Sequence, residues 1–174
     1  MNQLRQAALF LAVAALTVAA GFYLNPVTRE SVRDIDAAAV LATPLADLQG
    51  NPRTLDEWSG RMLVVNFWAT WCPPCLEEIP IFIRTQDRLG ERGLQFVGIA
   101  IDDPEKVRAF VEQQRMNYPT LVGQADAMAL SDLAGNARGG LPYTLVFDRA
   151  GHILSTHYGA LTEEKLESII LPAL

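Results

Sequence analysis

The sequence predicts an α/β domain that follows a single apolar segment at the N-terminus. Short apolar runs at residues 62–68 and 94–101 are suited to buried parallel strands, and a stretch with helical signals follows each of them. Near the C-terminus, the turn signal "DRAG" at residues 148–151 separates two strand-like runs, which predicts a hairpin. Parallel pairing early in the chain and antiparallel pairing late are typical of a domain of the α/β class.

The first 24 residues differ in composition from the rest of the chain. Residues 7–24 form an apolar run interrupted only by Thr17, which is near the minimum length for a helix that crosses a bilayer. Arg5 precedes the run, so we expect the N-terminus to stay in the cytoplasm and the remainder to be exported. The small residues 18–20 would also suit a cleavage site. Residues 1–24 are therefore interpreted as a membrane anchor or signal segment, and we favour an uncleaved transmembrane helix.

A polar linker is predicted at residues 25–39 and the folded domain at residues 40–174. The segment "VLATPLADLQGNPRTL" indicates two short strands around a turn at residues 49–52, which form an N-terminal β-hairpin extension.

Helices are predicted where capping residues and apolar spacing agree. Asp103 can cap a helix whose first residue is Pro104, because the fixed φ of proline suits that position. Thr162 can cap the final helix in the same way. Further helices are expected at about residues 73–90 and 125–135, with a short strand at 118–123 between the second and third helices of the domain.

The negative net charge argues against one class of function. The 174 residues carry a formal net charge of −6 at pH 7, and the pI is about 4.9. Nucleic-acid binding is not expected, because the chain has no basic stripe that could displace counterions from phosphates. Half of the residues are apolar, so one domain with a substantial core is readily supported.

Cys72 and Cys75 are the only cysteines, in the segment "FWATWCPPCLEEIP". Cys72 lies at the end of a predicted buried strand and just before a helix, where free N–H groups and the positive end of the helix dipole favour a thiolate. Cys75 follows one helical turn later. This arrangement predicts a redox pair in which Cys72 forms a mixed disulfide with a partner and Cys75 resolves it. Pro73 and Pro74 are expected to tune the redox poise.

Two other interpretations of the cysteines remain open. His152 and His157 would complete a four-ligand zinc site, but 76 residues separate the cysteine pair from the histidines, far more than in known zinc motifs. If residues 152–158 form a strand, the two histidines also point to opposite faces. A static structural disulfide is the other alternative, although a bridge across so short a loop constrains the unfolded chain little. No metal site and no cofactor are expected.

The segment "VVNFWATWCPPCLEEIP", between a strand and a helix, resembles the thioredoxin fold and in particular the membrane-anchored thioredoxin-like oxidoreductases of the TlpA/ResA/CcmG type. The resemblance covers about residues 40–174. It includes the leading hairpin, an insertion at about residues 102–124 and the segment "LPYTLVFDRAGHI". It implies a thioredoxin-like fold with a β-hairpin extension and a central insertion, preceded by a single transmembrane helix.

The resemblance also implies roles for individual residues. Cys72 is similar to the exposed nucleophile and Cys75 to the resolving thiol, which together form the redox-active disulfide. Pro142 resembles the cis-proline that faces the cysteines, and the backbone at Leu141 before it would pair with an extended substrate. From the residues alone, Pro142 would be taken as an ordinary trans proline at a strand start. Trp71 is expected in an apolar docking surface, whereas Trp68 is expected in the core.

Glu78 matches the acidic residue that follows the second cysteine in ResA-like proteins. Its spacing places it on the helix face that carries Cys75, where a carboxylate could take the proton of that thiol. The alternative is a solvated charge near the helix start, as we expect for Glu77. Asn66 stands where thioredoxin has a buried aspartate, and an amide cannot take a proton. The proton-transfer role therefore shifts toward Glu78 or water.

Together these features predict an exported, membrane-tethered protein-disulfide reductase. The resemblance implies a protein client, with apocytochrome c as the first expectation and copper-site cysteines of respiratory oxidases as the second. It also implies a transmembrane electron donor of the CcdA/DsbD type. The expected location is the bacterial inner membrane, with a single pass and the catalytic domain in the periplasm or otherwise outside the cytoplasm. Two alternatives remain: a disulfide-forming oxidant of the same fold, and a copper- or zinc-delivery protein that uses both cysteines as ligands.

Overall fold

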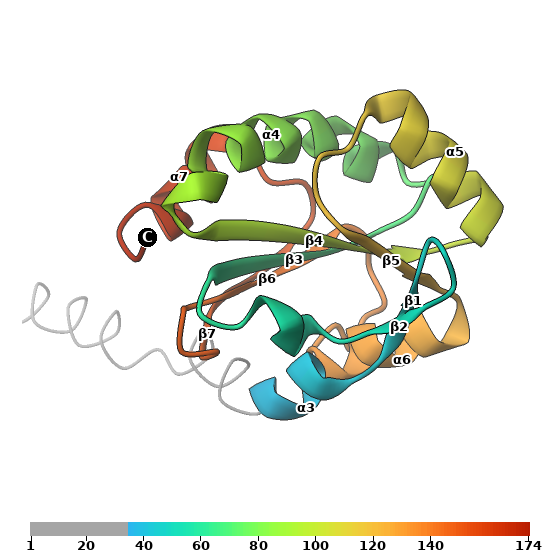
Figure 1. Ribbon diagram of the computed structural model, residues 1–174, viewed down its shortest axis with the longest axis horizontal. Coiled ribbons are helices and arrows are strands. Elements are labelled where there is room, and N and C mark those ends of the chain that lie inside the picture. The colour runs from blue at the N-terminus through green and yellow to red at the C-terminus, as the bar shows by residue number, and fades with distance from the viewer. Residues whose placement is uncertain (1–34) are drawn as a thin grey trace, which may run out of the picture. The chain divides into compact units, whose positions relative to one another are not determined.

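The computed structural model describes residues 35–174. They form one sheet of seven strands in the order β2-β1-β5-β4-β3-β6-β7, with helices on both faces (Figure 1). The predicted anchor at residues 1–24 and most of the predicted linker lie outside the described residues. Within residues 35–174, no helix is both long enough and apolar enough to cross a bilayer.

The centre of the sheet is built from strands whose every residue is buried. These are β3 (Met62–Trp68), β4 (Leu94–Ile101) and β6 (Tyr143–Phe147). β3 pairs in parallel with β4, and β4 pairs in parallel with β5 (Thr120–Gly123). β6 pairs antiparallel with both β3 and β7 (Ile153–Tyr158). The predicted bounds of β3 and β4 and the predicted switch from parallel to antiparallel pairing are confirmed.

The first element of the described chain is a helix, although the sequence predicted a strand that begins at residue 40. Residues 37–42 form helix α3 (Ala37–Ala42), capped by Asp36, whose carboxylate accepts a hydrogen bond of 3.0 Å from the Ala39 amide. The segment "AAAVLA" is composed mainly of alanine, the strongest helix former, and a cap precedes it. Only β1 (Leu45–Asp47) and β2 (Pro52–Arg53) remain as strands, and they pair antiparallel as the predicted hairpin.

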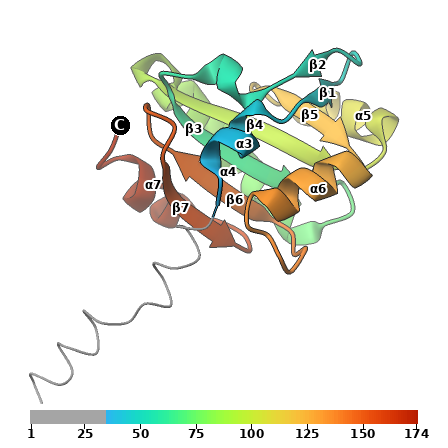
Figure 2. The same cartoon turned by 90° about the horizontal axis from the view of Figure 1, so that it is seen from below.

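The longer helices begin where the sequence signals place them. They are α4 (Pro73–Leu89), α5 (Pro104–Gln114), α6 (Ala125–Leu133) and α7 (Glu163–Ile170), with short 3₁₀ turns at Leu55–Trp58 and Gly90–Arg92. The side chains of Asp103 and Thr162 cap α5 and α7, as predicted. Figures 1 and 2 show α4, α5 and α7 on one face of the sheet and α3 and α6 on the other.

Each face of the sheet has its own apolar core. The core under α3 and α6 includes Phe67, Leu121 and Leu145, and the core under α4 and α7 includes Phe82, Phe96 and Leu166. A third cluster surrounds both cysteines at the C-terminal ends of β3 and β4. The parallel centre of the sheet therefore brings the segment that follows β3 and the segment that follows β4 to the same edge.

Candidate active site

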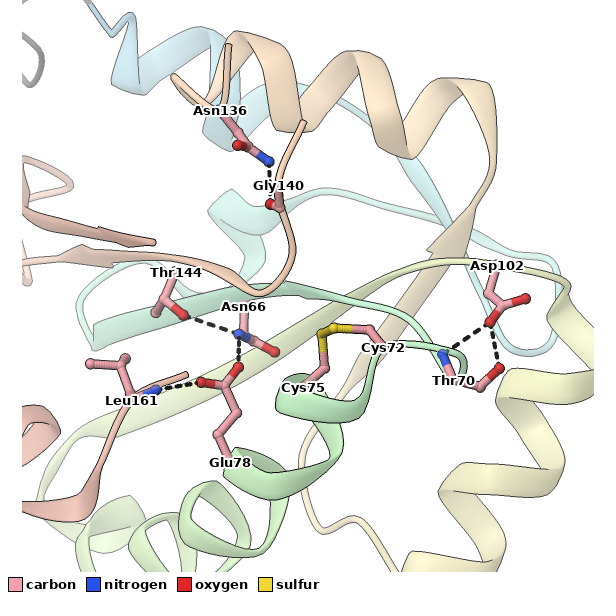
Figure 3. Close-up of a disulfide and its surroundings, with 10 residues drawn as sticks. All are labelled: Asn66, Thr70, Cys72, Cys75, Glu78, Asp102, Asn136, Gly140, Thr144 and Leu161. Carbon is pink, nitrogen blue, oxygen red and sulfur yellow. Dashed lines mark hydrogen bonds between the residues drawn. A yellow bond between two sulfur atoms is a disulfide. The ribbon is translucent and has the colours of Figure 1, made fainter. Parts of the chain in front are cut away.

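Cys72 and Cys75 form a disulfide at the N-terminus of α4, with a distance of 5.3 Å between their Cα atoms (Figure 3). Cys72 is the N-cap residue of α4, and its carbonyl accepts hydrogen bonds from the amides of Cys75 at 3.0 Å and Leu76 at 3.2 Å. The side chain of Cys75 is fully buried, whereas Cys72 keeps 4% of its surface exposed. Cys72 is therefore the cysteine that lies nearer to the surface.

The first two positions of α4 are Pro73 and Pro74. An N-cap side chain ordinarily accepts a hydrogen bond from the amide at the second or third helical position. Proline has no amide hydrogen, so the second position offers Cys72 no donor. The amide of Cys75, at the third position, donates to the Cys72 carbonyl. The helix start therefore leaves the Cys72 sulfur with few backbone donors.

Glu78 lies one turn after Cys75 on α4 and is fully buried, whereas Glu77 is exposed. Its Oε1 accepts a hydrogen bond of 2.7 Å from the Asn66 side-chain amide, and its Oε2 accepts one of 2.8 Å from the Leu161 backbone amide. The same Asn66 nitrogen also donates to the Thr144 hydroxyl at 3.0 Å. Glu78 is thus connected to β3 through Asn66 and to the segment before α7 through Leu161, and Thr144 on β6 holds Asn66 in place (Figure 3).

Burial in this network raises the pKa of Glu78 to about 7, although the hydrogen bonds from Leu161 and Asn66 act in the opposite direction. Desolvation disfavours the charged carboxylate, and the two donors recover only part of that cost. Both protonation states of Glu78 are therefore populated near neutral pH. A buried carboxylate in that condition can accept a proton from a neighbouring thiol and release it again.

The loop between β3 and Cys72 is attached to the end of β4 by Asp102. One carboxylate oxygen accepts hydrogen bonds from the Thr70 amide at 3.0 Å and the Thr70 hydroxyl at 2.5 Å, and the other accepts from the Asp103 amide at 2.7 Å. Burial raises the pKa of Asp102, but the hydrogen bonds from Thr70 and Asp103 outweigh it and leave the pKa below its usual value. Asp102 is therefore an anion, and its carboxylate holds the loop that positions Cys72 (Figure 3).

The loop before β6 packs through Leu141 against the apolar cluster that contains both cysteines, and the peptide bond between Leu141 and Pro142 is cis. Asn136 is fully buried and links this loop to α6. Its side-chain amide donates to the Gly140 carbonyl and to the Ser131 hydroxyl, both at 2.9 Å. Its side-chain carbonyl oxygen has no partner among the described residues.

Two tyrosines fix the start of the same loop. The Tyr143 hydroxyl donates to the Ala134 carbonyl and the Tyr158 hydroxyl to the Gly135 carbonyl, each at 2.8 Å. The loop that carries Leu141 is therefore anchored at several points.

The two tryptophans beside the cysteines differ in environment. Trp68 is fully buried at the end of β3 and packs against Phe110, which confirms the core position predicted from the sequence. Trp71 is 65% exposed, the largest exposed fraction among the large apolar side chains of residues 35–174. An indole exposed directly before the nucleophile candidate is available to a partner protein.

The two histidines lie in the hairpin that β6 and β7 form. His152 follows the turn after β6 and pairs with Asp148, with 3.1 Å between its Nδ1 and a carboxylate oxygen, and His157 lies on β7. Among residues 35–174, no group of three or more His, Cys, Asp and Glu side chains is arranged to hold a metal ion.

Sequence analysis did not identify Asp102, Asn136, Thr144 or the Leu161 amide. Asp102 had a visible signal, since it is a carboxylate at the carboxyl end of a buried strand next to the strand that leads to Cys72. Asn136 lies in the glycine-rich segment "GNARGG", which indicates only a loop. The Leu161 contact had no signal, because it uses a backbone amide that every residue other than proline carries.

Comparison with known protein families agrees with this geometry. The sequence profile of the Redoxin family matches residues 28–170. The thiol-disulfide oxidoreductase ResA of Halalkalibacterium halodurans is 29% identical over 161 residues, which cover 92% of this chain and 89% of the relative. The thioredoxin-like protein YneN of Bacillus subtilis is 29% identical over 127 residues, which cover 71% of each chain.

Solved structures resemble the described domain. A thiol:disulfide interchange protein of the thioredoxin family from Chlorobium tepidum aligns with a TM-score of 0.65 and 28% identity, over 75% of this chain and 91% of that one. A secreted thiol-disulfide isomerase from Corynebacterium glutamicum aligns with a TM-score of 0.68 at 20% identity, over 75% and 81% of the two chains, and shows the fold alone. The predicted thioredoxin-like α/β fold is confirmed.

Proposed function

The chain belongs to the Redoxin family and is a thiol–disulfide oxidoreductase, and we propose that it works as a protein-disulfide reductase through Cys72 and Cys75. The observation that carries the proposal is the disulfide between a cysteine at a helix N-terminus, which keeps 4% of its surface exposed, and a fully buried cysteine one turn later. This is the arrangement that thiol–disulfide exchange through a mixed disulfide requires.

The exchange proceeds in two steps from the dithiol form. The Cys72 thiolate attacks one sulfur of a client disulfide, a bond forms between the two sulfurs, and the second client sulfur leaves as a thiolate. The Cys75 thiol then loses its proton and attacks the Cys72 sulfur. The client's first sulfur leaves as a thiolate, and the Cys72–Cys75 disulfide forms. Two electrons pass from the protein to the client.

Glu78 is proposed as the group that accepts the proton of Cys75. The thiol is buried, so its proton needs an acceptor within the protein. Glu78 lies on the same helix one turn away and is itself buried. A pKa of about 7 leaves part of the Glu78 population ionised near neutral pH and able to accept that proton.

The helix start supports a reductant rather than an oxidant. A disulfide oxidant such as DsbA is strongly oxidising because its dithiol form is stabilised, mainly through a thiolate that the helix N-terminus and its surroundings favour. Here Pro73 and Pro74 remove backbone donors from the first turn of α4. A thiolate at Cys72 is stabilised less as a result, so the disulfide form is favoured and the pair gives up its electrons more readily.

The client, donor and location are proposed from the resemblance to the TlpA/ResA/CcmG type. Apocytochrome c before haem attachment is the first client, and copper-site cysteines of respiratory oxidases are the second. A transmembrane donor of the CcdA/DsbD type would return the Cys72–Cys75 disulfide to the dithiol form. The apolar segment at residues 1–24 would tether the domain to the inner membrane outside the cytoplasm.

The deciding measurement is the reduction potential of the Cys72–Cys75 pair in the full chain in detergent micelles, equilibrated against thiol–disulfide buffers. A potential near that of thioredoxin, roughly −270 mV, supports the reductase. A potential near that of DsbA, roughly −120 mV, assigns the protein to the disulfide donors and overturns the reductase proposal. Measurement of copper and zinc in the reduced protein tests the metal-delivery alternative.

A further inference from the structure

Leu141 carries unpaired backbone groups next to the cysteines. Its side chain packs against the apolar cluster that contains Cys72 and Cys75. Within residues 35–174, neither its amide nor its carbonyl forms a hydrogen bond, and strand β6 begins only at Tyr143. A backbone donor and a backbone acceptor that are both unpaired beside a strand can pair with an extended peptide. The strength of such pairing depends on how firmly this part of the loop is held before the peptide arrives.

The chain is held differently on the two sides of Leu141. On the C-terminal side, the Pro142 carbonyl accepts a hydrogen bond of 2.9 Å from the Gly159 amide. On the N-terminal side stand Gly139, with a φ of 59°, and Gly140. Glycine has more backbone freedom than any other residue. A Cβ atom at either glycine would have no heavy atom within 4 Å apart from those of its chain neighbours, so packing does not restrain these two residues.

The side chain of Asn136 supplies the restraint on the N-terminal side. Its Nδ2 donates to the Gly140 carbonyl at 2.9 Å (Figure 3) and to the Ser131 hydroxyl on α6 at 2.9 Å. Because a carbonyl oxygen can only accept, the bond to Gly140 also fixes which way the amide group of Asn136 points. The Asn136 backbone amide donates to the Ser131 carbonyl at 3.0 Å. The two glycines are therefore tied to a helix through Asn136.

Stability alone is a poor explanation for an asparagine at this position. The Asn136 side chain is fully buried, and its Oδ1 has no hydrogen-bond partner in the described part of the chain. A buried carbonyl oxygen without a partner destabilises a fold, and an apolar residue would avoid that loss. What the amide provides, and an apolar side chain does not, is a donor for the Gly140 carbonyl.

We propose that Asn136 is a positioning residue, which holds the unpaired amide and carbonyl of Leu141 in place to pair with the backbone of an extended client segment. The reacting cysteine of the client would then lie beside Cys72. The inference rests on the proposed function, because it takes the client to be a polypeptide that forms a mixed disulfide with Cys72. Pairing of this kind uses backbone groups, so it would accept clients of different sequence.

The test uses a short uncharged peptide of alanine and serine with one cysteine, whose sulfur is bonded to thiopyridine. The Cys72 thiolate of the reduced full chain, in nonionic micelles, attacks the peptide sulfur, and thiopyridone leaves. The Cys75 thiol then loses its proton and attacks the Cys72 sulfur, the peptide leaves as a thiolate, and the protein disulfide forms. Two electrons thus pass from the protein to the peptide disulfide. The absorbance of thiopyridone gives the second-order rate constant.

A second peptide has the same sequence but carries N-methyl groups on the two residues that flank the cysteine, which removes their backbone donors. In the wild type we expect N-methylation to slow the reaction about tenfold, the factor that corresponds to one net hydrogen bond. Asn136→Ala should react with the unmethylated peptide about tenfold more slowly than the wild type, and N-methylation should then have little further effect. With dithiodipyridine, a small disulfide that has no peptide backbone, the rate should fall far less.

Three further variants separate positioning from general stabilisation. Asn136→Asp keeps the shape of the side chain without its amide donor, so it should behave as Asn136→Ala does and replaces it if the alanine variant does not fold. Asn117→Ala removes an amide that also donates two hydrogen bonds, but to residues of α4, and should keep the wild-type rates with both peptides. In Asn136→Ala/Gly140→Ala, the new methyl group enters open space and restricts the loop backbone, which should recover part of the lost rate with the unmethylated peptide.

Other outcomes overturn the inference. A folded Asn136 variant that keeps the wild-type rate and the wild-type effect of N-methylation would show that Asn136 does not position the loop. A double variant as slow as Asn136→Ala would show that loop restraint is not what the side chain contributes. A wild-type rate that N-methylation leaves unchanged would show that Leu141 does not pair with the client. If the reduced wild type reacts with neither peptide and not with dithiodipyridine, the proposed function itself is wrong.

Discussion

Replacing Glu78 with glutamine should change how the stability of the oxidised protein depends on pH. Glu78 is fully buried, and burial raises its pKa from an ordinary value of 4.5 to about 7. Below pH 4.5 the carboxyl group is protonated in both the folded and the unfolded chain and contributes no pH dependence. Between pH 4.5 and 7 the unfolded chain ionises first, so it binds fewer protons than the folded chain and stability falls as pH rises.

The size of the effect follows from the same shift. The penalty is small at pH 5 and nearly complete at pH 8, so the free energy of unfolding should fall by roughly 2–3 kcal/mol between these two values through Glu78 alone. In Glu78→Gln this component is absent at every pH. The absolute stability of the variant is less informative, because a glutamine NH₂ group would face either the Asn66 or the Leu161 donor and leave it unpaired, at a cost of about 1–3 kcal/mol.

The assay is urea unfolding of the oxidised full chain in micelles at pH 5 and pH 8, with Glu77→Gln as the matched control. Glu77 is exposed in the same helical turn, so its replacement should leave the pH dependence of the wild type. A Glu78→Gln variant that loses as much stability between pH 5 and pH 8 as the wild type would refute the assignment of a buried carboxyl with a raised pKa. It would also remove the basis for Glu78 as proton acceptor.

Three further predictions concern the helix start, the cysteine loop and the core. Pro74→Ala restores an amide at the second position of α4, which could donate a hydrogen bond to the Cys72 thiolate. A bond of about 1.5–3 kcal/mol would raise the reduction potential by roughly 30–60 mV. The control Pro80→Ala, farther along the same helix, should leave the potential unchanged. Asp102→Ala should lower the free energy of unfolding by about 1–3 kcal/mol at neutral pH. Because the pKa of Asp102 is lowered, this difference from wild type should disappear as pH falls below the ordinary value of 3.8; a difference that persists there would argue against a charged contact. Phe82→Ala removes a buried ring that stacks on Phe96 with 5.0 Å between centroids and should cost about 3–5 kcal/mol in urea unfolding without moving the reduction potential.

Local patterns explain the parts of the structure that were predicted correctly. The bounds of β3 and β4 follow from apolar runs that are buried on both faces of a parallel sheet. The starts of α5 and α7 follow from Asp103 and Thr162, which cap through contacts two or three residues away. The strand predicted at residues 40–42 is wrong for the same reason, because a mildly apolar segment fits a strand or a helix, and the cap at Asp36 lies in the predicted linker.

The redox pair could be identified from the sequence, because Cys72 and Cys75 are the two cysteines of the chain and lie within one helical turn of each other. The environment of that pair, in contrast, depends on contacts between distant parts of the chain. The Leu161 amide reaches Glu78 across 83 residues, Thr144 reaches Asn66 across 78, and Thr70 reaches Asp102 across 32. These contacts depend on strand order and on the depth of burial, and they set the pKa of Glu78 and the position of the cysteine loop. No local pattern encodes them, since a carboxylate at the start of a helix has the same sequence signal whether it faces water or the core.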